Sequence, residues 1–463
     1  MTAERFDLVV IGGGPGGYAA ALYGAAAGMS VALVERDKVG GTCLHRGCIP
    51  AKQFLETATV FRTVAGAREF GVEADAPTVD FPTAQARKQK VVDQLWKGLQ
   101  SLMRSRRIKT VAGTGRLGRD KLVTVDDASE LAGNHVVLAS GSGPRTLPGF
   151  DVDGRIVCTS DEVLDLEHLP ESAVVIGGGA IGCEFASMMN DLGTRVTLLE
   201  ALPKILPGCD QDVARVVVRS FEKRGIDVRT GVAVRSQAPE GSRTTVTFGD
   251  DETVTVGMIV MSVGRRPLSE TLGLDGTAVE VDERGYVAVD AHMRTAEPGV
   301  YAVGDVVSTP QLAHVGFAEA VVAVKDMLGE RAIPVDYQKV PWCIYCSPEV
   351  AFAGLSEQAA RDAGLDVVVA KQRFSANSRA LIVGEPEGLV KVIAERQADG
   401  RAGRLLGVHM VGPAVTEQLA EGWLSVNWEA TPEDISQYIH PHPTLSETFG
   451  ETVMSLTGRG LHG

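Results

Sequence analysis

The chain has 463 residues, which is too long for one hydrophobic core and predicts about three domains. Hydrophobic residues make up 44% and charged residues 22%, an ordinary composition for a soluble globular protein. The formal net charge is −14, which argues against broad nucleic-acid binding because that function needs a basic surface.

The beginning of the chain has none of the features of a targeting segment. Residues 1–7 contain no basic region followed by an apolar stretch, and no apolar run approaches the roughly 18 residues of a membrane helix. We therefore expect a cytoplasmic protein that does not contact a membrane. A reducing compartment disfavours structural disulfides, and seven cysteines cannot all pair. Any disulfide that matters is expected to be catalytic.

A glycine-rich βαβ unit opens the chain, with the sequence LVVIGGGPGG at 8–17. Gly12 permits a tight turn, Gly14 lets the backbone approach a pyrophosphate, and Gly17 lets the helix pack closely on the strand. The unit ends at Glu35, 23 positions after the first glycine. A glutamate there accepts from a ribose 2′-hydroxyl and repels a 2′-phosphate. The unit thus favours FAD or NAD over NADP.

Two cysteines follow at once, in GGTCLHRGCIPAK at 40–52. On a regular helix, positions five apart differ by about 140° and about 7.5 Å along the axis. A disulfide needs Cα atoms about 4.4–6.8 Å apart. Cys43 and Cys48 can therefore bridge only where the helix is distorted, and Gly47 is the expected place. Such a small loop opens easily, as a redox-active pair must. The alternative is two buried free cysteines.

Lys52 stands one helical turn beyond Cys48. A cation at this position could interact with the electron-rich edge of a reduced flavin. Glu184 is its expected ion-pair partner, which makes sense if Lys52 is partly buried. The alternative is a solvated helix lysine.

A second copy of the glycine unit occurs at 173–182, with the sequence AVVIGGGAIG. Gly177, Gly179 and Gly182 repeat the roles of the first copy, and Glu200 again lies 23 positions after the first glycine. One such motif is a weak signal, but two with matched acidic residues are strong. The sequence therefore predicts an α/β protein with two Rossmann-like dinucleotide-binding domains.

The remaining segments suggest where the domains end. PRTLPG at 144–149 is typical of a linker, and GRRP at 264–267 closes the second unit. From about residue 340, strand patterns at 349–354 and 405–409 alternate with helical stretches, which predicts a C-terminal α+β domain. Cys343 and Cys346 form a Cys-x-x-Cys in a strand-like run without a partner pair. We interpret them as incidental and expect no metal site.

The segment HPHPTLSE at 440–447 contains the candidate base. Thiol chemistry needs a proton acceptor with a pKa near neutrality, and histidine supplies one. Glu447 could hold the His442 imidazole in one tautomer and stabilise its cation. His440 is the competing histidine, and an ordinary surface loop is the alternative.

Seven motifs together resemble those of the pyridine nucleotide–disulfide oxidoreductases, most closely the dihydrolipoyl dehydrogenases among them. They are GGTCLHRGCIPAK at 40–52, ASGS at 139–142, GGGAIGCE at 177–184, VGRRP at 263–267, YAVGD at 301–305, LAH at 312–314 and HPTLSE at 442–447. The resemblance covers nearly the whole chain. It implies an FAD-binding domain at 1–149, an NAD-binding domain at 150–273, a central domain at 274–340 that packs with the FAD domain, and an interface (dimerisation) domain at 341–463.

The resemblance also assigns cofactor contacts to this sequence. Those for FAD are Gly12, Gly14, Gly17, Glu35, Thr42, Lys52, Gly115, Ser140, Gly141, Ser142, Asp305 and Ala313. Those for NAD are Gly177, Gly179, Gly182, Glu184, Glu200 and Gly264.

The implied reaction is a ping-pong oxidation of protein-bound dihydrolipoamide to lipoamide with reduction of NAD. Dihydrolipoamide attacks through Cys43, and His442, assisted by Glu447, takes the proton. Cys48 passes electrons to the flavin and so to NAD. His442 would come from a partner subunit, so a homodimer is required. The implied substrate partner is a lipoyl-bearing acyltransferase or carrier protein.

Some positions depart from the commonest family pattern. His45 and Arg46 replace the usual Asn-Val or Asn-Ile, Leu268 replaces a frequent Asn, and Ala414 replaces a frequent His. The last two weaken the assignment near the nucleotide and the interface. Our hypothesis for Arg46 is that its charge depresses a cysteine pKa.

Other functions fit less well. The nearest alternative is an NAD(P)H-dependent reductase of another low-molecular-weight or protein disulfide. Glutathione-type relatives usually use NADP and need cations for its 2′-phosphate, which residues 201–203 do not supply. Mercuric-ion reductases carry paired cysteines at the C-terminus, and residues 456–463 contain none. Flavin transhydrogenases lack the cysteine pair. A non-catalytic FAD-binding scaffold would not need Cys43, Cys48 and His442.

Overall fold

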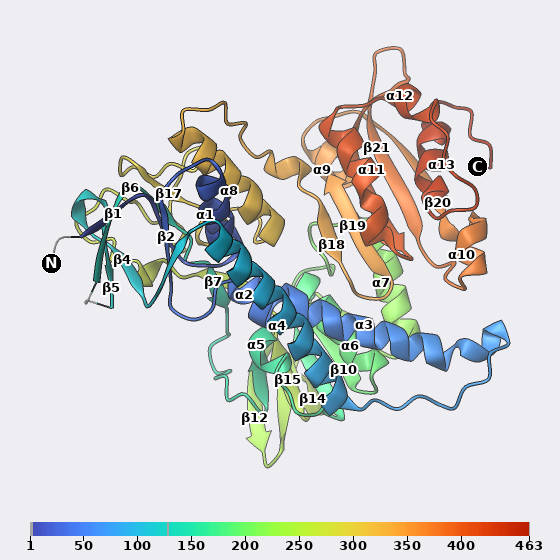
Figure 1. Ribbon diagram of the computed structural model, residues 1–463. Helices are drawn as coiled ribbons and strands as arrows, with labels where there is room; N and C mark the ends of the chain where they lie inside the picture. Colours follow the sequence, from blue (N-terminus) through green and yellow to red (C-terminus); the bar gives the residue numbers. More distant parts are fainter. Residues whose placement is uncertain (1–2, 127–128, 463) are drawn as a thin grey trace.

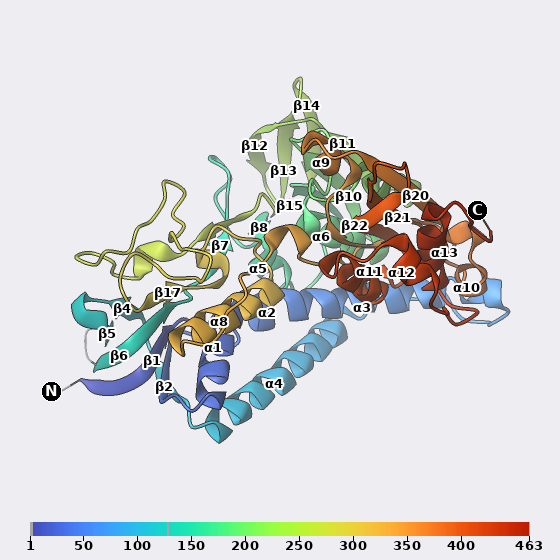
Figure 2. The ribbon, with the colours of Figure 1, turned by 90° about the horizontal axis from the view of Figure 1, so that it is seen from above.

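A computed structural model describes residues 3–126 and 129–462. Three lobes are visible in Figure 1: the N-terminal sheet at the left, a second sheet below the centre and the C-terminal sheet at the upper right. Helix α3 (Cys48–Ala65) runs from the first lobe beneath the C-terminal lobe, and the view from above in Figure 2 shows the same course. None of the described helices combines the length and apolarity needed to span a bilayer.

The first sheet contains the predicted N-terminal βαβ unit. β1 (Glu4–Ile11) pairs in parallel with β2 (Val31–Glu35) and with β6 (Ser129–Leu138). The strand order is β3–β2–β1–β6–β5–β4. The outer strands are β3 (Lys109–Ala112), β4 (Gly115–Leu117) and β5 (Leu122–Val125). The last four residues of β1 and the first four of β2 are apolar and buried, because helices and loops cover both faces of this parallel core.

A later segment of the chain returns to the first sheet. β17 (Val300–Ala302) pairs in parallel with β6, and α8 (Ala313–Met327) lies along α1 (Pro15–Ala26). α1 lies so close to this returning segment that a Cβ on Gly16 would stand only 3.0 Å from the Val303 side chain. The same lobe contains α2 (Gly41–Arg46), α4 (Phe81–Ser105), η1 (Ala67–Phe70), η2 (Arg119–Lys121), η3 (Ser269–Thr271) and η4 (Gly304–Val306).

The second sheet repeats the design of the first, as predicted. Its parallel strands have the order β11–β10–β9–β15–β8. They are β8 (Val157–Thr159), β9 (Ser172–Ile176), β10 (Arg195–Glu200), β11 (Asp227–Thr230) and β15 (Met258–Met261). Helices α5 (Ser160–Val163), α6 (Ala180–Asp191) and α7 (Gln211–Lys223) accompany them. An antiparallel meander consists of β12 (Val234–Glu240), β13 (Arg243–Phe248) and β14 (Glu252–Val256).

Two short strands join the first and second lobes. β7 (Ser142–Pro144) pairs antiparallel with β16 (Arg265–Pro267). The backbone N–H of Arg145 also donates to the carbonyl of Gly264 at 3.0 Å. The chain therefore enters and leaves the second lobe side by side, where the sequence indicated a linker at 144–149 and the end of the second unit at 264–267. The predicted domain boundaries themselves stay predictions.

The C-terminal lobe is an antiparallel sheet covered by helices, so the predicted α+β class is confirmed. Its strand order is β18–β19–β22–β21–β20. The strands are β18 (Trp342–Ile344), β19 (Glu349–Gly354), β20 (Val367–Arg373), β21 (Leu389–Arg396) and β22 (Ala402–Gly412). α11 (Val415–Asn427) packs on β19 and β22, and α13 (Glu447–Leu456) packs on β20 and β21. The other helices are α9 (Glu357–Asp362), α10 (Ser378–Ile382), α12 (Pro432–Ser436), η5 (Tyr337–Lys339) and η6 (Phe374–Ala376).

A buried ion cluster fastens the C-terminal lobe to the second lobe. The Lys391 ammonium lies 2.9 Å from Asp210, 2.9 Å from Asp212 and 2.8 Å from Glu357. His409 accepts from the backbone N–H of Asp210 at 3.2 Å. Burial opposes the charges on Asp210 and Asp212, but the lysine outweighs it, and the pKa values of the three carboxyls are lowered.

We predict that Lys391→Met lowers the free energy of unfolding by about 3–5 kcal/mol, because it leaves buried carboxylates without their cation. Lys371→Met is the control, since Lys371 is 49% exposed and contacts Asp212 at 3.0 Å; it should cost less than about 1 kcal/mol. The lowered carboxyl pKa values mean that the stabilisation is present above about pH 4 and is lost as the pH falls further. Denaturant unfolding of both variants at neutral and acidic pH checks this, and equal effects would contradict it.

Candidate active site

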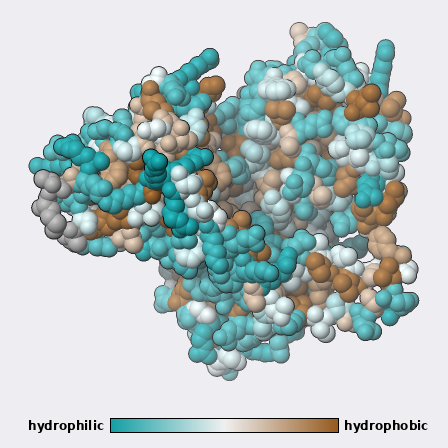
Figure 3. Space-filling view, in the orientation of Figure 1, coloured by the Kyte–Doolittle hydropathy of each residue, from teal (hydrophilic) through white to brown (hydrophobic). Residues whose placement is uncertain are grey.

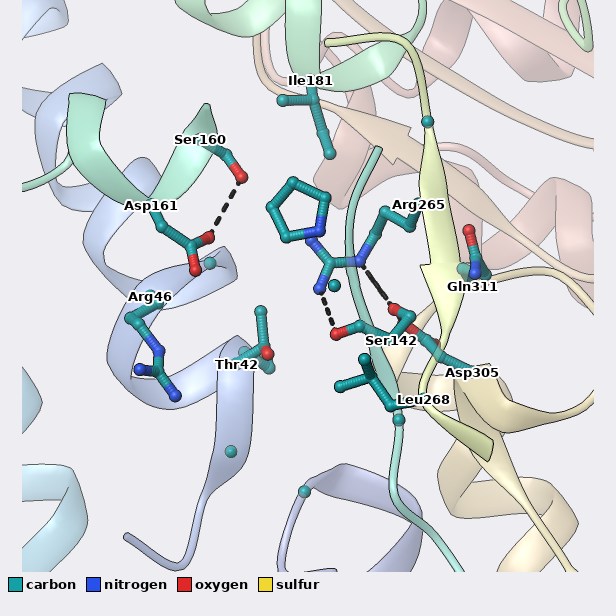
Figure 4. A pocket seen from close by; sticks show the side chains of 18 of the residues that line it. Thr42, Arg46, Ser142, Ser160, Asp161, Ile181, Arg265, Leu268, Asp305 and Gln311 are labelled. Carbon is teal, nitrogen blue, oxygen red and sulfur yellow. Dashed lines mark hydrogen bonds and ion pairs between the residues drawn. The ribbon is translucent and has the colours of Figure 1, made fainter. Parts of the chain in front are cut away.

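One large cavity of about 1050 Å³ lies where the first lobe, the second lobe and β18 meet. Figure 4 shows part of its wall from close by. Eighteen of the predicted site residues line it: Gly12, Gly14, Glu35, Thr42, Cys43, Cys48, Lys52, Gly115, Ser140, Gly141, Ser142, Gly177, Gly179, Glu184, Glu200, Gly264, Asp305 and Ala313. Residues far apart in the sequence thus form a single site.

The third glycine of each βαβ unit has a different position from the other two. Gly17 and Gly182 sit where the helix touches the turn that precedes it. A Cβ on Gly17 would lie 1.9 Å from the Gly12 carbonyl oxygen, and one on Gly182 would lie 1.8 Å from that of Gly177. Only glycine fits there. Gly17 and Gly182 therefore fix the position of the helix against the turn and do not line the cavity themselves.

The two glutamates that end the βαβ units have the same environment. Glu35 accepts from the backbone N–H of Gly13 at 2.7 Å and of Asp37 at 2.8 Å. Glu200 accepts from the N–H of Gly178 at 2.6 Å and of Leu202 at 2.7 Å. Each carboxylate is therefore held beside its glycine turn, where it can receive a ribose hydroxyl.

The residues of both turns fit dinucleotides. A Cβ on Gly14 or Gly179 would meet nothing within 4 Å, so both turns leave room for a phosphate at the N-terminus of a helix. Ser140 and Ser262 line the cavity, and their buried hydroxyls have no hydrogen-bond partner in the described part of the chain. A polar ligand would satisfy them.

The cysteine pair lies where two helices meet. α2 ends at Arg46 and α3 begins at Cys48, and Gly47 between them has φ −145° and ψ −112°. The predicted helix distortion at Gly47 is confirmed. Cys43 and Cys48 both line the cavity, and their thiols are close enough for a hydrogen bond. The pair is consistent with a redox-active disulfide.

The surroundings of the pair give its two sulfurs different acidities. The hydrogen bond from Cys43 and the charge of Lys52 lower the pKa of Cys48 to about 7, although burial works against this. The same hydrogen bond and burial raise the pKa of Cys43. Cys48 is therefore the sulfur that the site stabilises as a thiolate.

Lys52 forms the expected ion pair with Glu184. Its ammonium lies 2.9 Å from both carboxylate oxygens and 5.0 Å from the centre of the Tyr345 ring. Glu184 is buried and also accepts from the Tyr345 N–H at 2.9 Å. Burial opposes the charge on Lys52, but Glu184 outweighs it and the pKa of Lys52 is raised. The cation therefore stays charged beside Cys48.

The structure does not support the hypothesis that Arg46 acidifies a cysteine, which stays a prediction. The Arg46 guanidinium points to Asp37, 3.0 Å away. The pKa of Cys48 is lowered chiefly by the hydrogen bond from the Cys43 thiol and then by the charge of Lys52.

His442 and Glu447 form the expected pair but do not line the cavity. His442 Nδ1 lies 2.8 Å from Glu447, which also accepts from the Thr444 N–H at 2.7 Å. Partial burial opposes the charge on Glu447, but these contacts stabilise the carboxylate and lower its pKa. The His442 side chain is 71% exposed. His440 pairs instead with Glu421 at 2.9 Å.

Sequence reasoning missed Arg265, although it lies in the quoted VGRRP motif. Arg265 donates to the Ser142 hydroxyl at 2.7 Å and to the Ser142 carbonyl at 2.8 Å, and it lies 3.7 Å from Asp305 (Figure 4). Cys343 and Trp342 of β18 line the cavity as well. Among residues 3–126 and 129–462, no group of three or more His, Cys, Asp or Glu is arranged to hold a metal ion.

Two dinucleotide-binding folds that share one cavity with a thiol pair and a partly buried ion pair define a nucleotide-dependent thiol–disulfide oxidoreductase. The family model for pyridine nucleotide-disulphide oxidoreductases matches residues 6–320, and the model for their dimerisation domain matches residues 340–453. The chain belongs to the pyridine nucleotide-disulphide oxidoreductase family. Membership implies FAD and a pyridine nucleotide as cofactors.

Similar proteins extend over the full length of the chain. A dihydrolipoyl dehydrogenase from Bacillus subtilis (strain 168) is 40% identical over 477 residues, covering 99% of this chain and 100% of the relative. One from Thermus scotoductus is 40% identical over 465 residues, covering 99% of each. Among solved structures, LpdA from Mycobacterium tuberculosis has a TM-score of 0.90 at 27% identity, covering 98% of this chain and 100% of its own. The flavoprotein disulfide reductase RclA from Escherichia coli has a TM-score of 0.87 at 26% identity, covering 97% and 99%.

We predict that removing Lys52 and removing Glu184 shift the pKa of Cys48 in opposite directions. Lys52→Met removes the cation and should raise the pKa of Cys48 by about one to three units, whereas Glu184→Gln removes a nearby negative charge and should lower it. The measurement is a pH titration of the long-wavelength thiolate–flavin absorption in the two-electron-reduced protein. Shifts of the same sign in both variants would contradict the assignment.

Proposed function

We propose that the protein oxidises protein-bound dihydrolipoamide to lipoamide and reduces NAD to NADH, through a redox-active Cys43–Cys48 disulfide. The observation that carries this proposal is the thiol pair beside a partly buried lysine, in a cavity shared by two dinucleotide folds. Full-length similarity to dihydrolipoyl dehydrogenases supports the substrate. The lipoyl dithiol loses two electrons and two protons, NAD takes up a hydride, and one proton passes to solvent.

The cysteines divide the sulfur chemistry between them. A substrate thiolate attacks Cys43, the S–S bond to Cys48 breaks, and Cys48 leaves as a thiolate that Lys52 stabilises. The second substrate sulfur then attacks the first, which forms the lipoamide disulfide and releases the Cys43 thiolate. The lowered pKa of Cys48 makes it the better leaving group. Bound FAD supplies a two-electron acceptor that can return a hydride to NAD.

His442 is the proposed base for the substrate thiols. Glu447 accepts from Nδ1–H, which leaves Nε2 as the proton acceptor and stabilises the imidazolium that forms. In a single chain this pair lies outside the cavity wall. A second copy of the chain that brings His442 to Cys43 would complete the site.

A homodimer is therefore part of the proposal, and the match to a dimerisation domain supports it. Val60, Phe70, Leu381 and Ile382 are 54–60% exposed, and brown surface gathers over α10 and the end of α3 at the right of Figure 3. Ile439, three residues before His442, is 96% exposed. Apolar surface of this kind is typical of a protein interface.

Glu200 supports NAD as the nucleotide rather than NADP, because a fixed carboxylate repels a 2′-phosphate. The proposed protein partner is a lipoyl-bearing acyltransferase or carrier protein. A cytoplasmic location stays a prediction; a reducing compartment suits a chain whose proposed disulfide is catalytic rather than structural.

The central test is steady-state turnover of dihydrolipoamide with NAD. Cys43→Ser and Cys48→Ser should each abolish turnover, because each removes one half of the disulfide. Other low-molecular-weight thiols and their disulfides, assayed in parallel, test the alternative suggested by RclA, a reductase of a different disulfide. Turnover that survives either substitution would overturn the proposed chemistry, and a strong preference for another thiol would overturn the substrate.

We predict that two inactive variants complement each other. Cys43→Ser and His442→Gln subunits, unfolded and refolded together, should regain about a quarter of the wild-type activity, because random pairing gives half mixed dimers with one intact site each. If His442 acted within its own chain, the mixed dimers would stay inactive. Refolding each variant alone is the control.

We predict that Glu200→Ala reduces the preference for NAD over NADP. The ratio of kcat/KM for NAD to that for NADP should fall about tenfold, the effect of losing about 1.4 kcal/mol of discrimination. Glu240→Ala, an exposed glutamate on the same lobe, is the control. An unchanged ratio would show that Glu200 does not select the nucleotide.

A further inference from the structure

Arg46 is a charged side chain in the cavity wall that the reaction outlined above does not use. It ends α2, and Thr42, one turn earlier on the same helix face, lines the cavity too. The start of α2 abuts the first glycine turn, since a Cβ on Gly41 would lie 2.6 Å from the Cα of Gly14. The guanidinium therefore belongs to the part of the cavity that surrounds the first βαβ unit.

Two successive contacts link Arg46 to Glu35, the carboxylate beside the first glycine turn. Glu35, which is held beside the first glycine turn, accepts from the Asp37 N–H at 2.8 Å. The Asp37 carboxylate in turn lies 3.0 Å from the Arg46 guanidinium. Arg46 is thus anchored two contacts away from the carboxylate suited to an adenosine ribose.

Three carboxylates stand in the cavity wall around Arg46, and Arg36 and Arg265 are further cations in the same wall. Asp161, the first-turn residue of α5, also lines the cavity, and Figure 4 shows it near both Arg46 and Arg265. Burial raises the pKa of Asp161, and the charges of Arg265 and Arg46 partly offset this. Glu35, Asp37 and Asp161 therefore bring three carboxylates to a region where a dinucleotide adds a pyrophosphate with two negative charges. Without a cation these charges repel one another.

We propose that Arg46 is an FAD-retaining residue, whose guanidinium offsets the repulsion between the cofactor pyrophosphate and the carboxylates of Asp37 and Asp161 at the edge of the adenosine half of the cavity. This inference rests on the proposed function, because it takes FAD to occupy the first βαβ unit. It gives a role to a residue that departs from the usual apolar one at this position. Arg46 retains the cofactor, and Lys52 serves the thiols.

The test measures FAD affinity rather than turnover. FAD is titrated into apoprotein and followed by quenching of flavin fluorescence, for wild type, Arg46→Val and Arg46→Lys. Arg46→Val should raise the Kd for FAD about tenfold, and Arg46→Lys should restore most of the affinity because it keeps the charge. Added salt should weaken binding by the wild type more than by Arg46→Val. The matched control is Arg266→Val, which removes a 53% exposed arginine paired with Glu270 at 2.7 Å; its Kd should not change.

A second-site variant separates charge from damage to the fold. Asp161→Asn in the Arg46→Val background should recover part of the lost affinity, because it removes a carboxylate that Arg46 no longer offsets. Equal FAD affinity for wild type and Arg46→Val overturns the inference, and so does a double variant as weak as Arg46→Val alone. Wild-type apoprotein that binds no FAD would overturn the proposed function instead, so the two failures are distinguishable.

Discussion

The ion pair between Lys52 and Glu184 is the contact on which the site depends. It joins α3 of the first lobe to α6 of the second, and the Tyr345 N–H binds the same carboxylate from the C-terminal lobe. All three lobes thus meet at one buried charge. The pair also keeps a cation beside Cys48, and that cation adds to the hydrogen bond from Cys43 in lowering the pKa of the thiol.

Around that contact, the molecule uses one design twice. Both nucleotide folds fix a glutamate with two backbone N–H groups, and both use a glycine that tolerates no Cβ where helix and turn touch. The units face a common cavity, so two ligands of the same chemical class can approach one dithiol.

Local sequence predicted the features that depend on neighbours along the chain. The βαβ units follow from glycine spacing, and the break at Gly47 follows from the reach of a disulfide. The Lys52–Glu184 pair could also be predicted from the sequence, because a lysine that is removed from water needs a partner of opposite charge. Three other features could not be predicted from the sequence, because each depends on how distant segments pack. They are the direction of Arg46, the hydrogen bonds from Arg265 to Ser142 and the ion cluster around Lys391. The position of His442 outside the cavity is likewise a property of the assembled fold.

The paired strands β7 and β16 have a consequence for the architecture as a whole. Since the chain leaves the first lobe at Pro144 and returns opposite it at Arg265, the intervening nucleotide fold is topologically a module inserted into a continuous host. Residues Ser142 and Pro267 face each other across this ribbon. A tight turn could join the ends of β7 and β16 in place of the second lobe. The second lobe could therefore be replaced by another domain without changing the path of the chain in the first lobe.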